Sequence, residues 1–358
     1  MDFSLLEQLV ALPTPTGFEL DGMRLLASSL RDEVSDLHLD CHGNLRMRVN
    51  PDCRQVVMLE AHCDEIGFIV QYIDDDGLIS LSPLGGVTVP LVAGERIVLL
   101  GPNGPVNGVF AVRPIHLMSA EEREKCAPSK LDQIQVDIGA RSREDALKAV
   151  ELGTPAVVNS GWRPMMNGQV SCRGFDNRAG AFVVAEATRR LAKESLQVQL
   201  NTVFSVQEEV GLVGGITAAQ EIRPKIGFCV DVTFATDVQK QDRKVIGDVA
   251  LGKGPVVAIG PTYHQGLRGL VEQSAREARI PYQHQVRSRG TGTCAWAMRM
   301  AHGGAAVSQV SIPLRYMHTP IEVISLEDLE RTVELLVAAI RSIPADMELC
   351  QRLDPCAE

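Results

Sequence analysis

The segment Gln55-Val56-Val57-Met58-Leu59-Glu60-Ala61, followed by His62-Cys63-Asp64-Glu65, decides how the chain is organised. Its first seven residues are mainly apolar, and a short apolar run of this length predicts a buried strand. The strand ends in a cluster of ionisable side chains. Beyond this cluster the pattern of the sequence changes. We therefore expect one structural unit to be interrupted here by another of a different kind.

The residues that follow, 66–159, show short β-type runs separated by glycine and proline. The runs are Leu78–Leu81, Arg96–Leu100 and Val106–Val112. Closely spaced strands with turn signals between them are typical of a small barrel or sandwich. A helix is expected near Arg143–Glu151, where the block closes. No candidate metal ligand falls inside this block.

Strands and helices alternate once the chain passes Gly161. A helix is expected over Ala179–Lys193, directly after Asp176. The last helix is expected to begin at Ser325, because Ser325-Leu326-Glu327-Asp328 resembles a capping box. Alternation of this kind predicts an α/β fold, with a mixed sheet flanked by helices. The remaining expected elements are helices near 4–12 and 20–31 and strands at Thr202–Val206, Ile226–Val232 and Ala305–Ile312.

Composition excludes several classes of protein. The 358 residues carry a formal net charge of −10 and no Lys/Arg-rich run, so no nucleic-acid partner is expected. The nine cysteines are scattered without a Cys-x-x-Cys pair, which argues against a disulfide framework and a structural zinc site. No apolar run reaches the roughly 18 residues of a membrane span. The N-terminus lacks the basic start of a signal peptide. We expect a cytoplasmic protein without a membrane partner.

Five short segments carry clustered acids or histidines, and four of them lie at or just past the end of a predicted strand. In open α/β sheets, sites are built at that edge. Each segment alone has an ordinary structural interpretation, such as a helix N-cap or a solvated acidic pair. A carboxylate in the apolar run 228–232 is harder to explain, because burying it without a partner is costly. The candidate residues are His62, Asp64, Asp176, Glu208, Glu209, Asp231 and His318.

Taken together, the candidates indicate a metal site. Two histidines and three carboxylates suit two zinc or cobalt ions, with one acid bridging them. His62 could bind through a neutral nitrogen while Asp64 orients its ring. Of the adjacent glutamates Glu208 and Glu209, one could bind metal while the other handles protons. Other chemistries fit less well, since the chain has no Gly-x-Ser-x-Gly, His-Glu-x-x-His or phosphate-loop motif.

At these residues the sequence resembles the tetrahedral, self-compartmentalising aminopeptidases, which include glutamyl and deblocking aminopeptidases. The resemblance covers nearly the whole chain. It rests on residues 61–67 (AHCDEIG), 174–178 (GFDNR), 207–211 (QEEVG), 231–233 (DVT) and 312–318 (IPLRYMH). It implies a metallopeptidase catalytic domain made of residues 1–65 and 160–358. It also implies an inserted dimerisation domain at 66–159 and assembly of dimers into tetrahedral dodecamers.

The same resemblance assigns roles to the candidate residues. One of two divalent ions would be held by His62, Asp176 and Asp231, and the other by Asp176, Glu209 and His318. Glu208 would be the general base and Asp64 would support His62. The implied activity is removal of N-terminal residues from peptides by a metal-activated water. A metal-dependent deacylase of small amides and, less favoured, an endoglucanase remain as alternatives.

The sequence departs from this family pattern at two positions. Asn177 stands where an aspartate is common, and Cys294 replaces another aspartate. Neither position is an expected ligand. We expect both to lie near the substrate and to bear on specificity.

Overall fold

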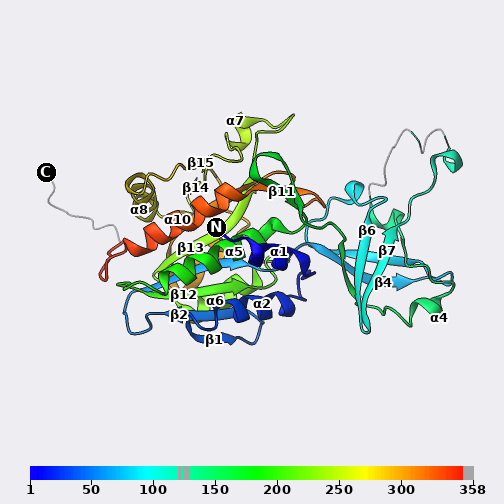
Figure 1. The fold of residues 1–358 in the computed structure, drawn as a ribbon, viewed down its shortest axis with the longest axis horizontal. Helices are drawn as coiled ribbons and strands as arrows, with labels where there is room; N and C mark the ends of the chain where they lie inside the picture. Colours follow the sequence, from blue (N-terminus) through cyan, green and yellow to red (C-terminus); the bar gives the residue numbers. More distant parts are fainter. Residues whose placement is uncertain (120–122, 124–129, 350–358) are drawn as a thin grey trace.

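The structure is a computed structural model that describes residues 1–119, 123 and 130–349. The chain forms two bodies, a sheet covered by helices and a barrel that projects from one end (Figure 1). Within the described residues, no helix has both the length and the apolar character needed to cross a membrane.

An eight-stranded mixed sheet forms the centre of the larger body, in the order β1-β2-β12-β3-β13-β16-β14-β15. Its four middle strands, β12, β3, β13 and β16, are parallel, and the registers place Ser205 opposite His62 and Ser311 opposite Asp231. The carboxyl ends of these strands therefore meet at one edge. The strands are β1 Ser35–Leu39, β2 Leu45–Val49, β3 Val56–His62, β12 Gln199–Ser205, β13 Ile226–Phe234, β14 Val256–Ile259, β15 Gln283–Val286 and β16 Ala306–Leu314.

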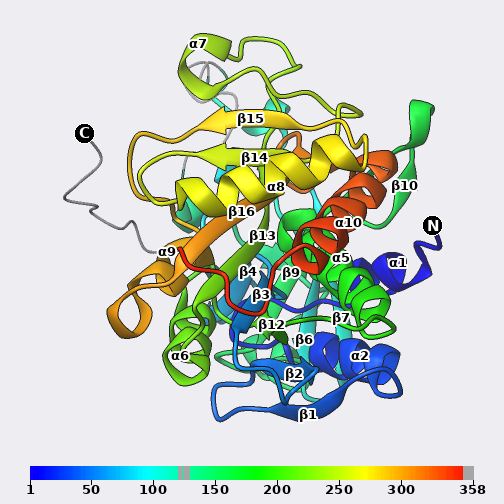
Figure 2. The same ribbon diagram turned by 90° about the vertical axis from the view of Figure 1, so that its left-hand side faces the viewer.

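Helices cover both faces of the sheet, as Figure 2 shows. On one face α5 packs on β3 and β13 and also contacts α1, α2 and α10, while α8 lies against β14 and β16. On the other face α6 packs on β12 and β3, and α9 on β13 and β16. The helices are α1 Ser4–Ala11, α2 Leu20–Leu30, α5 Phe175–Leu191, α6 Val213–Ile222, α7 Arg243–Ile246, α8 Gln265–Glu277, α9 Cys294–Met300 and α10 Leu326–Arg341.

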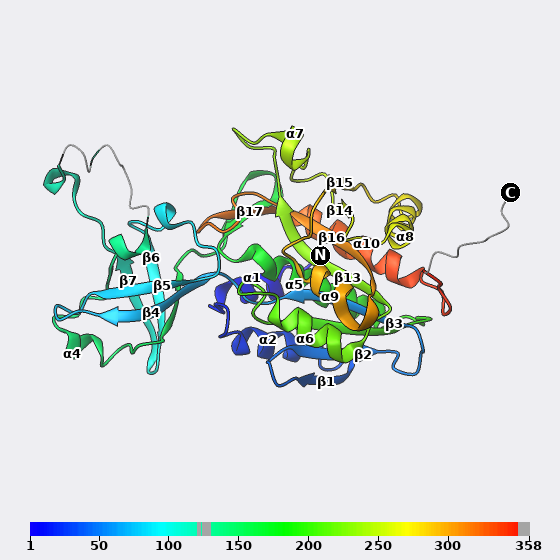
Figure 3. The same cartoon turned by 180° about the vertical axis from the view of Figure 1, so that it is seen from behind.

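The second body is a closed barrel with the order β4-β5-β8-β7-β6-β9. It has its own apolar core, in which Phe68 and Phe110 pack edge to face at 5.3 Å between ring centroids. Figure 3 shows it from behind, to one side of the helices that cover the large sheet. Its elements are β4 Gly67–Ile73, β5 Ile79–Leu84, β6 Arg96–Gly101, β7 Gly104–Phe110, β8 Val136–Asp137, α4 Arg143–Ala146 and β9 Pro155–Val158.

Short elements complete the chain. A three-stranded sheet, β10-β11-β17, contacts α5, β16 and α10 of the larger body through β17, and β17 is followed directly by α10. Its strands are β10 Arg163–Pro164, β11 Gln169–Cys172 and β17 Glu322–Ser325. Five single-turn 3₁₀ helices are described: η1 Val89–Leu91, η2 Ile115–Leu117, η3 Leu131–Gln133, η4 Met166–Gly168 and η5 Ala301–Gly303.

The structure confirms the expected α/β fold with an inserted barrel and corrects two details. The helix expected over 143–151 is the single turn α4, which ends at Ala146. The capping box at Ser325 does not form, since its side chain makes no capping hydrogen bond. Ser325 is instead paired with Gln169 in the β11–β17 ladder. The carboxylate of Asp328 is used elsewhere, because it accepts the N–H groups of Gly252 and Gly254 at 2.6 and 2.7 Å.

Candidate metal centre

The predicted ligands come from five separate elements that meet at the carboxyl edge of the parallel strands. His62 ends β3, Asp231 lies near the end of β13, and Glu209 follows β12. His318 follows β16, and Asp176 begins α5 with backbone angles that are not yet helical. All five line one cavity of about 640 Å³. The parallel register thus converts distant sequence positions into neighbours.

Three of these side chains form what we call the inner group: His62, Asp176 and Asp231. Nε2 of His62 lies 3.3 Å from Oδ1 of Asp176 and 3.8 Å from Oδ1 of Asp231. All three residues are buried. Two of them project from adjacent strands of the sheet, which gives this group a rigid support.

Asp176 also belongs to the outer group, with Glu209 and His318. Nε2 of His318 lies 3.3 Å from Oδ2 of Asp176 and 3.3 Å from Oε1 of Glu209. The two oxygens of Asp176 therefore face two different imidazoles. The His318 side chain is 31% exposed, whereas that of His62 is 3% exposed. Glu209 and His318 lie on loops, and His318 reaches the solvent.

The spacing of these atoms suits metal coordination. Within each group the possible ligand atoms all lie within 4.8 Å of one another. Two donors bound to one ion at about 2.0–2.2 Å in tetrahedral geometry are roughly 3.4 Å apart. The 3.3 Å separations around Asp176 match that value closely. The donor set, imidazole with carboxylate, is also one that zinc and cobalt accept.

The electrostatics of the cluster indicate a need for positive charge. Burial opposes protonation of His62 and His318, but the carboxylates around them outweigh it; the pKa of His318 rises to about 11 and that of His62 well above its usual range. Burial raises the pKa of Glu209 and of Asp231. Divalent ions between these atoms would supply the positive charge and keep both rings neutral, the form in which imidazole binds metals.

Glu208 lines the same cavity but belongs to neither group. Burial raises its pKa to about 9, with His62 opposing the shift and the neighbouring carboxylates, Asp231 first, adding to it. A carboxylate beside the ligands but outside the donor set is placed to exchange a proton with a bound molecule.

Comparison with known proteins identifies the family. A family model described as M42 glutamyl aminopeptidase matches residues 43–335. The chain belongs to this family. It is therefore an aminopeptidase, a hydrolase of peptide bonds, as the sequence predicted. The expected resemblance to the tetrahedral aminopeptidases is confirmed as well.

Three relatives illustrate how far this peptidase resembles known members. The lysyl aminopeptidase of Pyrococcus furiosus is 32% identical over 96% of this chain and 98% of its own length. A TET aminopeptidase from the archaeon Thaumarchaeota archaeon SCGC AB-539-E09 superposes with a TM-score of 0.90 at 29% identity, covering 96% of each chain. The TET1 peptidase of Pyrococcus horikoshii, which can assemble into a tetrahedron or a large octahedral shell, gives 0.85 at 29% identity, covering 95% of this chain and 99% of its own.

In this peptidase Asp64 contacts other residues of the site in addition to His62. Its Oδ1 atom lies 3.3 Å from Nδ1 of His62, without forming a well-aligned hydrogen bond. The same carboxylate accepts the backbone N–H groups of Glu208 and Glu209, both at 3.1 Å. Asp64 thus connects the end of β3 to the glutamate pair after β12, and it is fully buried.

The outer group has two supports that sequence reasoning did not assign. The carboxylate of Glu322 accepts the backbone N–H of Asp176 at 3.1 Å and that of His318 at 2.9 Å. Nδ1 of His318 lies 2.9 Å from the carbonyl oxygen of Gly86, which belongs to the inserted block. A ring N–H bonded to a carbonyl leaves the other nitrogen free to bind metal. The barrel segment therefore contacts the site.

Only part of this support left a signal in the sequence. Glu322 follows His318 by four residues, in a segment already singled out for its histidine. Gly86 gives no such signal, because a backbone carbonyl carries no side-chain identity. A Cβ atom at this position would lie 3.0 Å from Nδ1 of His318. A side chain at this position would therefore press on the ring of His318, a long-range contact that only the fold creates.

The two departures from the family pattern do not face the cavity, contrary to expectation. Asn177 is fully buried; its amide donates to the carbonyl of Val230 at 2.8 Å and its Oδ1 accepts the N–H of Gly180 at 3.1 Å. Cys294 is buried at the start of α9, with Sγ 3.9 Å from Oγ of Ser205. Neither residue lines the cavity, whereas the residues just before them in the chain, Asp176 and Thr293, do.

Proposed function

We propose that the protein is a dinuclear metal-dependent aminopeptidase that removes N-terminal residues from peptides. The observation that carries the proposal is the placement of Asp176, whose two oxygens each lie 3.3 Å from a different imidazole. A carboxylate in that position suits a bridge between two ions. His62 and Asp231 would complete one site, and Glu209 and His318 the other.

We further propose that the ions are zinc or cobalt, two per subunit, held by a catalytic domain of residues 1–65 and 160–358. When bound, such ions would lower the pKa of a water molecule and polarise the scissile carbonyl. The protein's own acid–base group would be Glu208. It would accept the proton of the attacking water and return it to the leaving amine. Asp64 would keep Glu208 in place through the backbone contact at 3.1 Å.

Metal content tests the proposal directly. The purified protein, stripped with a chelator and titrated with zinc or cobalt, is expected to take up two ions per chain. A stoichiometry that never exceeds one ion would contradict the shared role of Asp176. The same preparations, assayed on aminoacyl anilides, N-acylated small amides and carboxymethylcellulose, distinguish an aminopeptidase from a deacylase or an endoglucanase. Turnover confined to substrates with a free N-terminus supports the proposal.

Substituting the two adjacent glutamates one at a time distinguishes metal binding from proton transfer. Glu209→Gln should weaken metal binding, because a neutral amide is a poor replacement for a charged ligand. Glu208→Gln should keep both ions and lose about 10²–10⁴-fold in turnover, the usual contribution of a general base. Metal content and kcat are measured for both variants side by side. A fully active Glu208→Gln enzyme would contradict the proposed role of Glu208 as general base, and with it the proposed mechanism.

We also propose that residues 66–159 serve assembly, with dimers forming a tetrahedral dodecamer. The structural relative from Pyrococcus horikoshii forms such closed shells. In this block, several apolar side chains in and beside η2 are exposed to solvent. The exposed fractions of Ile115 and Leu117 are 60% and 64%, and Val112 is 49% exposed. Exposed apolar clusters commonly mark protein–protein contacts.

Charged substitutions in this cluster test the assembly role. Ile115→Asp together with Leu117→Asp should give a smaller particle by size-exclusion chromatography with light scattering. Neither side chain lines the metal cavity, so metal content should stay the same. An unchanged large assembly would argue against the proposed surface.

A further inference from the structure

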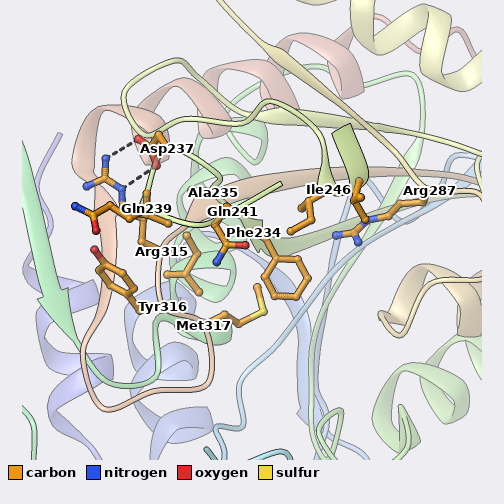
Figure 4. A pocket seen from close by; sticks show the side chains of 13 residues that line it. Phe234, Ala235, Asp237, Gln239, Gln241, Ile246, Arg287, Arg315, Tyr316 and Met317 are labelled. Atoms are coloured by element: carbon orange, nitrogen blue, oxygen red, sulfur yellow. Dashed lines mark hydrogen bonds and ion pairs between the residues drawn. The ribbon is translucent and has the colours of Figure 1, made fainter. Parts of the chain in front are cut away.

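A second cavity, of about 940 Å³, adjoins the one that holds the candidate ligands. The two cavities share three wall residues, Phe234, Arg287 and Met317. Figure 4 shows the guanidinium of Arg287 directed into this cavity, beside Phe234 and Ile246. Phe234 is 44% exposed, so the shared wall offers an apolar surface to a bound chain. A molecule held at the metal centre can extend from one cavity into the other.

Two arginines line the second cavity, and they differ in their partners. Nε and Nη2 of Arg315 lie 2.8 and 2.5 Å from the two carboxylate oxygens of Asp237. Its charge is thereby balanced. Nη2 of Arg287 donates instead to the hydroxyl of Thr233 at 3.0 Å, and its guanidinium lies 5.6 Å from the ring centroid of Phe234. Among the described residues, no carboxylate forms an ion pair with Arg287.

The distance from Arg287 to the metal centre suits a short peptide. Thr233 follows Asp231 by two residues on β13, so the two side chains lie on the same face of the strand. Two residues of strand span about 6.6 Å. A guanidinium bonded to Thr233 is therefore within reach of a substrate that extends one to two residues from the inner group, at about 3.3–3.6 Å per residue.

We propose that Arg287 binds a carboxylate of the substrate and so determines which peptides this enzyme prefers. The proposal rests on the aminopeptidase function argued above. A guanidinium prefers carboxylates because its planar fork donates two parallel hydrogen bonds. Two substrate carboxylates are within the required reach: an acidic side chain on the N-terminal residue, and the C-terminus of a dipeptide or tripeptide.

Replacing Arg287 by methionine removes the charge and keeps most of the volume. Four substrates are compared: glutamyl anilide, leucyl anilide, the dipeptide Leu-Gly and its amide. If the acidic side chain is bound, kcat/KM should fall about tenfold to a hundredfold for the glutamyl anilide alone, the range expected for a hydrogen bond between charged groups. If the C-terminus is bound, the same fall should occur for the dipeptide and not for its amide. The leucyl anilide should change less than threefold.

A matched control is Arg299→Met. Arg299 also lies over an aromatic ring, 5.6 Å from the centroid of Trp296, but it lines neither cavity. All four substrates should keep their kcat/KM in this variant. Arg287→Lys should recover part of the lost discrimination, because it restores the charge without the fork. Arg287→Glu should reverse it, favouring lysyl over glutamyl anilide.

The outcomes separate this inference from the function on which it rests. An enzyme that turns over leucyl anilide normally, with Arg287→Met leaving carboxylate discrimination unchanged, overturns the role of Arg287 alone. An equal loss on all four substrates, with metal content preserved, overturns it too, because the residue would then act on catalysis in general. A wild-type protein inactive on every anilide and peptide contradicts the aminopeptidase function itself, and the role of Arg287 with it.

Discussion

The inner and outer groups share Asp176 yet are built differently. The inner group takes His62 and Asp231 from neighbouring strands in the middle of the sheet, and both are buried. The outer group takes Glu209 and His318 from loops. It depends on contacts from elsewhere, the carboxylate of Glu322 and the carbonyl of Gly86.

The candidate metal centre thus has a rigid half, the inner group, and an adjustable half, the outer group. Strand residues are fixed by ladders of backbone hydrogen bonds, whereas loop residues are held only by the contacts that reach them. The adjustable half is also the one touched by the inserted block, through Gly86. The barrel is therefore part of the environment of the site, in addition to its proposed role in assembly.

The largest effect is expected where the two halves meet. Asp176→Asn should remove the shared ligand and with it both ions, so activity should fall by more than the roughly 10²–10⁴-fold attributed to a general base. Elemental analysis and kcat/KM measure the loss. Retention of two ions in this variant would show that neither group depends on Asp176, and would contradict its role as the shared ligand.

A smaller effect, larger in the outer half than in the inner half, is expected for Glu322→Gln, because His318 belongs to the outer group alone. The amide keeps the size of the side chain but weakens acceptance of the N–H groups of Asp176 and His318. Loss of such a supporting contact typically costs 10–100-fold in metal affinity. Competition titration with a chromophoric chelator should show one of two binding steps weakened by about that factor. Equal weakening of both steps would mean that Glu322 supports the whole centre.

In the unaltered protein the two halves should release their ions in order. His318 is 31% exposed and His62 is 3% exposed, so the outer ion is expected to leave first. We expect the two dissociation constants to differ by about tenfold, the lower end of the effect of supporting contacts. Stepwise chelation with elemental analysis at each step measures this. In Glu209→Gln only the inner step should remain. Release of both ions in a single step from the unaltered protein would refute the distinction.

The smallest effect is expected for Gly86→Ala, which adds a Cβ atom 3.0 Å from Nδ1 of His318. The ring must shift by a few tenths of an ångström, so affinity for the outer ion should fall about threefold to tenfold, below the usual range for lost supporting contacts. Gly161→Ala is the control, since a Cβ there meets nothing within 4 Å. An unchanged outer step in Gly86→Ala would show that the inserted block does not influence the site.

Much of the fold was predictable because its signals are local. The apolar run that ends at His62, the turn-rich block and the later alternation of strands and helices each follow from spacing along the chain. The capping box at Ser325 failed for the opposite reason. Asp328 finds distant donors in Gly252 and Gly254, and no local rule anticipates a competing partner from another segment.

For the candidate site, too, local features could be predicted from the sequence and long-range contacts could not. The sequence by itself singled out the candidate metal ligands, because acids and histidines at strand ends are rare enough in combination to be recognised. Only the tertiary structure decided which of them meet, since the start of α5 places Asp176 between His62 and His318. It alone also supplied Gly86 and left Arg287 without a carboxylate partner among the described residues. A contact through a backbone carbonyl cannot be recognised in a sequence, because every residue has one. Nor can the sequence show that an arginine lacks a carboxylate partner, because that depends on which side chains the fold brings near it.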